Sequence, residues 1–112
     1  MPDIYATGDL RKVSNGVFMA VNYIMEDFDA GKYPIPLSGG HSELLTAMEN
    51  ARRMPEIFDE SDRVALTFPR APVMVTRTKD GLAVLLTQDP GEYFSRMFLE
   101  AFRDTDVEAR VQ

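Results

Sequence analysis

Residues 64–87, VALTFPRAPVMVTRTKDGLAVLLT, decide the fold that this chain can adopt. Residues 64–68 alternate between large apolar and smaller side chains, and this period of two is typical of a strand with one buried face. Two more apolar runs, at 73–78 and 82–87, flank Lys79-Asp80-Gly81, and an Asp-Gly pair between such runs favours a hairpin turn. The stretch therefore predicts three antiparallel strands.

The composition of these strands also bears on their packing. Pro69 and Pro72 are expected to interrupt the region between the first two strands, because proline has no N–H to give to a ladder. Both faces of the hairpin at 73–87 carry apolar side chains. One face is therefore expected to pack on helices, and the other to be only partly exposed to water and in part available as an interface.

The segment that follows has the clearest helix start in the chain. Asp89 is a suitable N-cap, Pro90 takes the first helical position, and Glu92 stands three residues after the cap, as in a capping box. The expected buried face consists of apolar residues at helical spacing: Phe94, Met97, Phe98, Ala101 and Phe102. The polar residues 104–112 are expected to fray as a tail.

Toward the N-terminus, the sequence supports two interpretations. Apolar residues recur at helical spacing between Gly16 and Phe28, which predicts a first helix over about residues 16–30. Asn15-Gly16 is also a strong hairpin signal, so a hairpin over residues 10–21 is the competing interpretation. The helical pattern is the longer of the two, and the helix is preferred.

The middle of the chain connects these elements. Prolines and glycines in residues 32–40 predict an irregular connection. A second helix is expected to end near Met54, because Pro55 disfavours helical geometry in the residue before it, and residues 56–62 are interpreted as a loop or a short helical turn. The expected buried face of that helix is Leu44, Leu45, Met48 and Ala51.

The order of these elements predicts the fold class. A short strand at residues 3–6 could join the three strands of 64–87 as a fourth. We expect one α+β domain over residues 1–112, with a three-stranded or four-stranded antiparallel sheet packed against about three helices.

Charge and composition exclude several classes of protein. The 112 residues hold 18 acidic and 12 basic side chains, a net charge of −6 that disfavours nucleic acid, except through mimicry of its phosphates, and anionic membranes. The same charge favours a protein partner with a basic surface. With no Cys there is no disulfide or thiolate chemistry, so a cytoplasmic location is expected. His41 is the only His, and no catalytic spacing or cofactor motif surrounds it, so we expect neither an enzyme nor a cofactor.

Carboxylates gather at residues 26–29 and 56–62, and the second group surrounds two apolar residues. Acids around an apolar pair could attract a basic partner and then anchor it. The competing interpretation places the apolar pair in the core beneath the loop. Calcium binding is disfavoured because the segment lacks the central Gly and terminal Glu of a calcium loop, and no metal site is expected. The predicted partner-binding set is Ile57, Phe58, Asp59, Glu60 and Asp62.

A second candidate site is the glycine-rich turn formed by Gly39, Gly40, His41 and Ser42. It leads directly into the second helix, where free N–H groups and the helix dipole favour an anion. It lacks the Lys-Ser/Thr pair of a phosphate-binding loop, and no strand precedes it as a dinucleotide motif requires. The plain interpretation is a turn in which Gly40 or Ser42 caps the helix, and a phosphate or nucleotide site is the alternative.

These observations favour a small cytoplasmic binding protein that acts by protein–protein contact. Examples of the class are an inhibitor, an immunity protein or antitoxin, and a phage-encoded antagonist of a defence enzyme, each of which occludes a basic functional surface. An anion-binding or nucleotide-binding domain that uses Gly39-Gly40-His41 is the first alternative. A structural subunit of a larger assembly is the second, and the sequence leaves the oligomeric state open.

Overall fold

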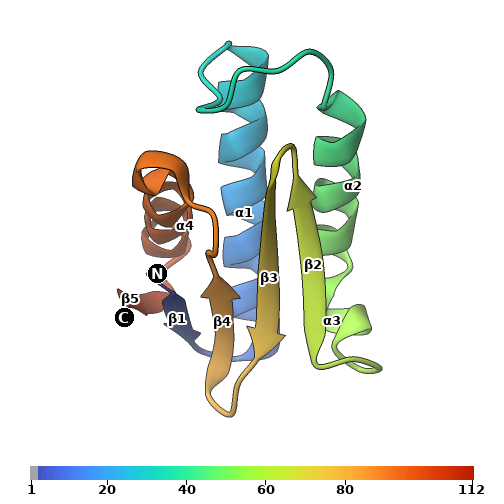
Figure 1. Ribbon diagram of the computed structural model, residues 1–112. Coiled ribbons are helices and arrows are strands. Elements are labelled where there is room, and N and C mark those ends of the chain that lie inside the picture. Colours follow the sequence, from blue (N-terminus) through green and yellow to red (C-terminus); the bar gives the residue numbers. More distant parts are fainter. Residues whose placement is uncertain (1–2) are drawn as a thin grey trace.

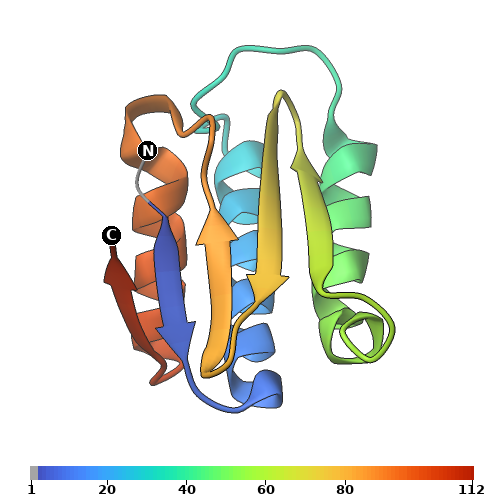
Figure 2. The ribbon, with the colours of Figure 1, turned by 60° about the horizontal axis from the view of Figure 1, so that its bottom comes forward.

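Five antiparallel strands form one sheet in the order β2-β3-β4-β1-β5 (Figures 1 and 2). The computed structural model describes residues 3–112, so Met1 and Pro2 of the expected domain lie outside the described residues. The strands are β1 (Ile4–Thr7), β2 (Arg63–Phe68), β3 (Ala71–Arg77), β4 (Gly81–Leu85) and β5 (Glu108–Val111). The helices are α1 (Leu10–Asp29), α2 (His41–Arg52), α3 (Met54–Ile57) and α4 (Tyr93–Asp104), and a 3₁₀ turn at Pro90–Glu92 precedes α4.

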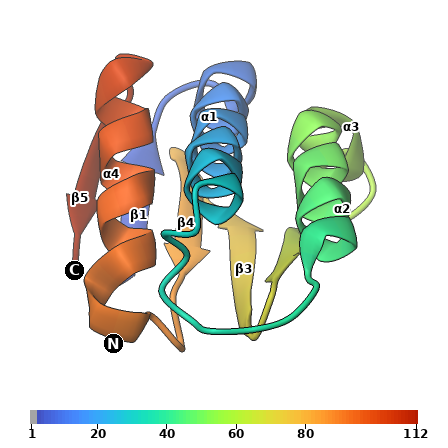
Figure 3. The ribbon, with the colours of Figure 1, turned by 90° about the horizontal axis from the view of Figure 1, so that it is seen from above.

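The helices cover one face of the sheet. Figure 3 shows α4, α1 and α2 side by side in a single layer, with the strands in a second layer. The expected α+β class is confirmed, as is the fourth strand near the N-terminus, which is β1. The expected strand number is too low, because the sheet has a fifth strand, β5.

The three strands expected from residues 64–87 are present, and their register builds the core. Val64, Val75, Val84 and Ile4 lie opposite one another across β2, β3, β4 and β1, and all four are buried. At the other end of β4, a Cβ on Gly81 would meet the Ala6 carbonyl oxygen at 2.0 Å. Glycine is therefore required at this position by the close approach of β1.

Pro72 belongs to the second strand, although it was expected to lie in the interruption between the first two strands. It lies inside β3 opposite Thr67, and the β3–β4 ladder begins two residues later, at Met74. The Arg77 N–H donates to the Asp62 carbonyl, and ladder alternation then turns the nitrogen of Pro72 away from β2. The absence of an N–H at Pro72 therefore removes no hydrogen bond from the sheet.

α1 is a helix, and the hairpin interpretation of its first half is wrong. The helix starts at Leu10, earlier than expected, because the Asp9 carboxylate accepts a hydrogen bond from the Lys12 N–H at 3.0 Å. Asn15 and Gly16 lie in the middle of the helix, where Gly16 is buried. The helical stripe of buried residues overrides the local turn signal because it packs against both the sheet and α4.

The connection at residues 31–40 is irregular, as expected, and Tyr33 anchors it to the sheet by donating its hydroxyl to the Pro69 carbonyl at 2.7 Å. α2 then buries Leu44, Ala47 and Ala51. Leu45 does not belong to this face, since half of its surface is exposed (50%). α2 ends before Arg53, and the short helix α3 follows directly. Pro55 lies in the first turn of α3, where a backbone N–H has no partner within the helix and is not needed.

Asp89 caps the last helix in a different way from a capping box. Its carboxylate accepts hydrogen bonds from the Phe94 N–H at 2.6 Å and the Ser95 N–H at 3.1 Å, so the helix proper begins at Tyr93. Glu92 has a positive φ of 59° and is exposed, and it takes no part in the cap. The five residues expected on the buried face of α4 are all buried.

Residues 104–112 do not fray, contrary to expectation. Val107 is 6% exposed, and its N–H donates to the Phe102 carbonyl at 2.7 Å, which turns the chain back toward the sheet. Asp3 and Gln112 then exchange two backbone hydrogen bonds, of 3.2 and 2.9 Å, at the end of the β1–β5 ladder. This pairing needs a strand more than one hundred positions earlier in the chain, so local polarity could not reveal it.

The face of the sheet opposite the helices is only partly exposed to solvent. Met74 and Leu85 form one cross-strand pair on this face and Thr76 and Ala83 form the next, and their side chains are buried or half-buried by their neighbours. Within residues 3–112, no helix combines the length and the apolar character that crossing a membrane requires.

Candidate binding surfaces

The acidic residues predicted to bind a partner lie where α3 turns into β2. The Ile57 carbonyl accepts hydrogen bonds from the Glu60 and Ser61 N–H groups at 3.0 and 2.9 Å, and this turn projects the side chains outward. Asp59, Glu60 and Asp62 are all exposed. We call these three residues the acidic corner.

The two apolar residues beside the acidic corner, Ile57 and Phe58, differ in burial. Phe58 is 4% exposed and belongs to the core, so the core interpretation is correct for this side chain and it cannot serve as an exposed anchor. Ile57 is half-buried and packs against the core from its edge. Of the predicted set, Ile57 and the acidic corner therefore remain available at the surface.

The electrostatics of the acidic corner are simple. Among residues 3–112, its three carboxylates make no ion pair, although ion pairs of 3.8 Å occur elsewhere at Lys12–Asp106 and Arg53–Glu56. Arg77 is directed to the Phe58 carbonyl, to which its guanidinium donates at 3.3 Å. Nowhere between Asp3 and Gln112 do three or more His, Cys, Asp or Glu side chains gather closely enough to hold a metal ion. What this corner offers is exposed negative charge that forms no ion pair with a basic side chain of residues 3–112.

The glycine-rich turn forms the N-terminus of α2. Gly39 and Gly40 have positive φ angles of 85° and 95°, and Gly40 is the N-cap residue, without any side-chain cap. His41 is exposed, and its Nδ1 lies 3.9 Å from the Asp29 carboxylate. With Glu43 also in the first turn of α2, carboxylates already occupy the neighbourhood of the helix N-terminus. The turn is therefore better suited to a helix cap than to binding an anion.

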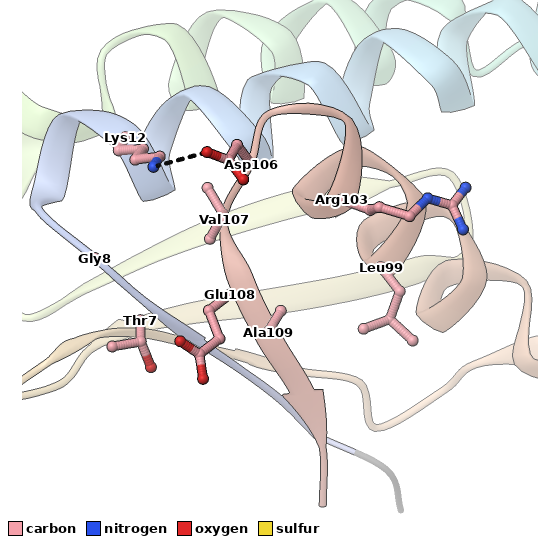
Figure 4. A pocket seen from close by; sticks show the side chains of 9 residues that line it. All are labelled: Thr7, Gly8, Lys12, Leu99, Arg103, Asp106, Val107, Glu108 and Ala109. Atoms are coloured by element: carbon pink, nitrogen blue, oxygen red, sulfur yellow. Dashed lines mark ion pairs between the residues drawn. The ribbon is translucent and has the colours of Figure 1, made fainter.

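The structure also forms a surface that the sequence did not indicate. A hollow opens between the start of α1, the C-terminal end of α4 and β5 (Figure 4). The Leu99 and Ala109 side chains lie within it, whereas Lys12, Arg103 and Asp106 stand at its rim. A second hollow continues along α4 to Val111 and shares Leu99 and Arg103 with the first. We call this continuous depression the α4–β5 groove.

The α4–β5 groove is not evident from the sequence, in which the polar residues 104–112 indicate a frayed tail. The signal that could have shown it is the alternation of Val107, Ala109 and Val111 with polar residues, which has the period of a strand. The stretch is short and follows a helix directly, so this signal was weak.

Comparison with protein-family models, with curated protein sequences and with solved structures gives no match for this chain. A function is therefore inferred from the residues of the chain itself.

Proposed function

We propose that this protein binds a partner protein with a basic surface, through the acidic corner Asp59, Glu60 and Asp62. The single observation that carries the proposal is that these three exposed carboxylates make no ion pair within residues 3–112, in a chain of net charge −6. Unneutralised charge of one sign accelerates encounter with a surface of the opposite sign. The half-buried Ile57, two residues before Asp59, adds a small apolar contact beside these carboxylates.

The mode of action that fits this surface is occlusion. A small acidic protein that covers a basic functional surface prevents its normal ligand from reaching it, as an inhibitor, an immunity protein or an antagonist of a defence enzyme does. The proposal includes a cytoplasmic setting, which agrees with a chain that has no Cys. It requires no cofactor and no catalytic group.

The experiment is affinity capture from a lysate of the native host, read by quantitative mass spectrometry. The test variant is Asp59→Lys/Glu60→Lys/Asp62→Lys. The matched control is Glu26→Lys/Asp29→Lys/Asp80→Lys, which changes the net charge by the same amount at exposed positions elsewhere. We expect basic proteins to be retained by the wild type and by the control and lost by the test variant. Equal loss in both variants would reduce the effect to net charge, and retention by the test variant would remove the acidic corner from consideration.

A further inference from the structure

β5 has an outer edge whose backbone groups have no partner among residues 3–112. Asp3 and Gln112 form a hydrogen-bonded pair, so the alternation of an antiparallel ladder makes Tyr5–Arg110 and Thr7–Glu108 the next such pairs. The N–H and C=O groups of the residues between them, Ala109 and Val111, therefore point away from β1. No residue between Asp3 and Gln112 pairs with this side of β5, which is the end of the sheet.

The opposite edge of the sheet is already partly covered. On β2, the Ser61 hydroxyl accepts a hydrogen bond from the Arg63 N–H at 3.3 Å and donates to the Arg63 carbonyl at 3.0 Å. These are backbone groups that ladder alternation turns away from β3, so a local side chain satisfies them. β5 lacks such a device, and an uncovered strand edge is a template for another strand.

We propose that β5 pairs in antiparallel fashion with β5 of a second copy of this chain, about a two-fold axis that passes beside Ala109. In this register Ala109 lies opposite Ala109 of the second copy, and the two exchange both backbone hydrogen bonds. Glu108 then lies directly opposite Arg110 of the second copy, and the symmetry creates this contact twice. Opposite charges at directly opposed positions stabilise an antiparallel pair.

The charges of β5 also exclude the neighbouring registers. Only Ala109 and Val111 present free N–H groups, so the strand can shift by whole two-residue steps only. A shift in one direction sets Arg110 against Arg110 of the second copy, and a shift in the other direction sets Glu108 against Glu108. Both place like charges directly opposite each other, which is destabilising. The sequence Glu108-Ala109-Arg110 is therefore self-complementary in one register.

In the proposed dimer, side chains of the α4–β5 groove add a second set of contacts beside the paired strands. Figure 3 shows that β5 lies on the outer side of α4, so the strand edge is reachable past the helix. Val111 borders the groove and is 47% exposed, and Leu99 lies in its floor. The rim along α4 carries charges of alternating sign at Arg96, Glu100 and Arg103. Two antiparallel copies of such a rim can set positive groups against negative ones over an apolar centre.

The result is a continuous sheet across two copies, with β5 at its centre and β2 at each end. The acidic corner precedes β2, at the edge farthest from β5, so the dimer leaves it exposed and carries it twice. A dimer through β5 does not require the proposed function, so either can fail alone.

The experiment measures molar mass by light scattering or sedimentation equilibrium over a range of protein concentrations. We expect the wild type to approach twice the 12.6 kDa of the chain. Glu108→Arg and Arg110→Glu should each be monomeric over that range, because each sets like charges in opposition twice. An equimolar mixture of the two variants should regain the doubled mass, since the variants are complementary to each other. Arg63→Glu, at the far edge of the sheet, is the matched control and should keep the wild-type mass.

Circular dichroism and thermal melting establish that each variant is folded, and the mixture itself separates loss of pairing from loss of folding. A wild type that remains monomeric up to hundreds of micromolar would overturn the proposal. Dimers that persist in both single variants would do the same. Monomeric variants that do not associate when mixed would overturn the register that opposes Glu108 and Arg110.

Discussion

The ring of Phe102 in α4 lies so close to the backbone of Gly16 in α1 that a Cβ at Gly16 would stand 2.5 Å from Phe102 Cδ1. Both residues are fully buried or nearly so, and Phe102 is 0% exposed. Gly16 therefore occupies the middle of a helix not for flexibility but because α1 and α4 approach closely there. α4 packs against α1 through this contact among others, and β5 follows α4 directly in the chain.

Gly16→Ala is therefore expected to destabilise the protein even though alanine is the better helix former. Overpacking a core costs about 1–3 kcal/mol, while the change from glycine to alanine recovers about 1 kcal/mol of helix propensity. We expect a net loss of up to about 2 kcal/mol in the free energy of unfolding, measured by urea denaturation. Asn15→Ala, at the exposed neighbouring position, is the control and should not destabilise.

The same contact predicts coupling between the two positions. Phe102→Leu should cost less in the Gly16→Ala background than in the wild type, because the smaller side chain leaves room for the new methyl group. Strictly additive losses in the double-mutant cycle would show that the ring of Phe102 does not limit position 16.

Asp89 is expected to control the stability of α4. Its carboxylate accepts from the N–H groups of Phe94 and Ser95 and from the Ser95 hydroxyl. Asp89→Ala should lower the free energy of unfolding by about 1–2 kcal/mol, as the loss of an N-cap does, and Asp89→Asn should lower it less. Denaturant unfolding followed by far-UV circular dichroism measures both. Glu92→Ala is the matched control and should have little effect, whereas an equal loss there would restore the capping-box interpretation.

The protein is expected to lose stability at alkaline pH through the half-buried Tyr33 and the buried Tyr93. Burial raises the pKa of Tyr33, and burial together with the hydrogen bond to Asp27, 2.7 Å long, raises the pKa of Tyr93. A raised pKa in the folded state means that stability is full below the pKa of the unfolded tyrosine, about 10, and falls as pH rises beyond it. The urea midpoint should therefore decrease above about pH 10.

Tyr93→Phe tests the source of this decrease. The variant loses the hydrogen bond to Asp27, so it should be less stable near neutral pH, by about 0.5–1.5 kcal/mol. Its urea midpoint should nevertheless depend less steeply on pH in the alkaline range, because one titrating group is gone. A slope equal to that of the wild type would assign the alkaline loss to other groups.

Phosphates and nucleotides are expected not to stabilise the protein. Asp29 and Glu43 place negative charge near the N-terminus of α2, which opposes an anion at Gly40. A ligand at about 100 times its dissociation constant would add about 2.7 kcal/mol, which a thermal-shift assay detects readily. A rise in Tm with phosphate or ATP that disappears in His41→Ala would contradict this expectation and favour the anion site.

For the helices, local sequence predicted the buried faces better than the exact ends. The buried face of α4 was predicted residue by residue, because an amphipathic stripe with a period of 3.6 is a local property. Asp89 was identified as the cap, but the two N–H groups that it binds were not, since the 3₁₀ turn at Pro90–Glu92 displaces the helix start. The start of α1 was missed because Asp9 stands ahead of the apolar stripe that served as the signal.

For the candidate sites, the sequence predicted where the charged residues cluster but not which neighbouring side chains are buried. The acidic corner is exposed, as its composition indicated, whereas Phe58 was ambiguous because an aromatic residue next to acids fits a core and a surface equally well. For the α4–β5 groove, the alternation at residues 107–111 indicated at most a strand. The groove itself was not predicted, because its floor and rim come from three segments that only the folded chain brings together.

By itself, the sequence determined the α+β class, the three strands of residues 64–87, the buried face of α4 and the excess of negative charge. These follow from periodicity, turn chemistry and composition, which act over a few residues. The tertiary structure decided that Asn15-Gly16 is helical, that residues 108–111 form a strand, and that this strand ends the sheet with free backbone groups. Each of these depends on a partner distant in the chain, Phe102 for Gly16 and β1 for β5, and a contact energy of that kind has no local signature.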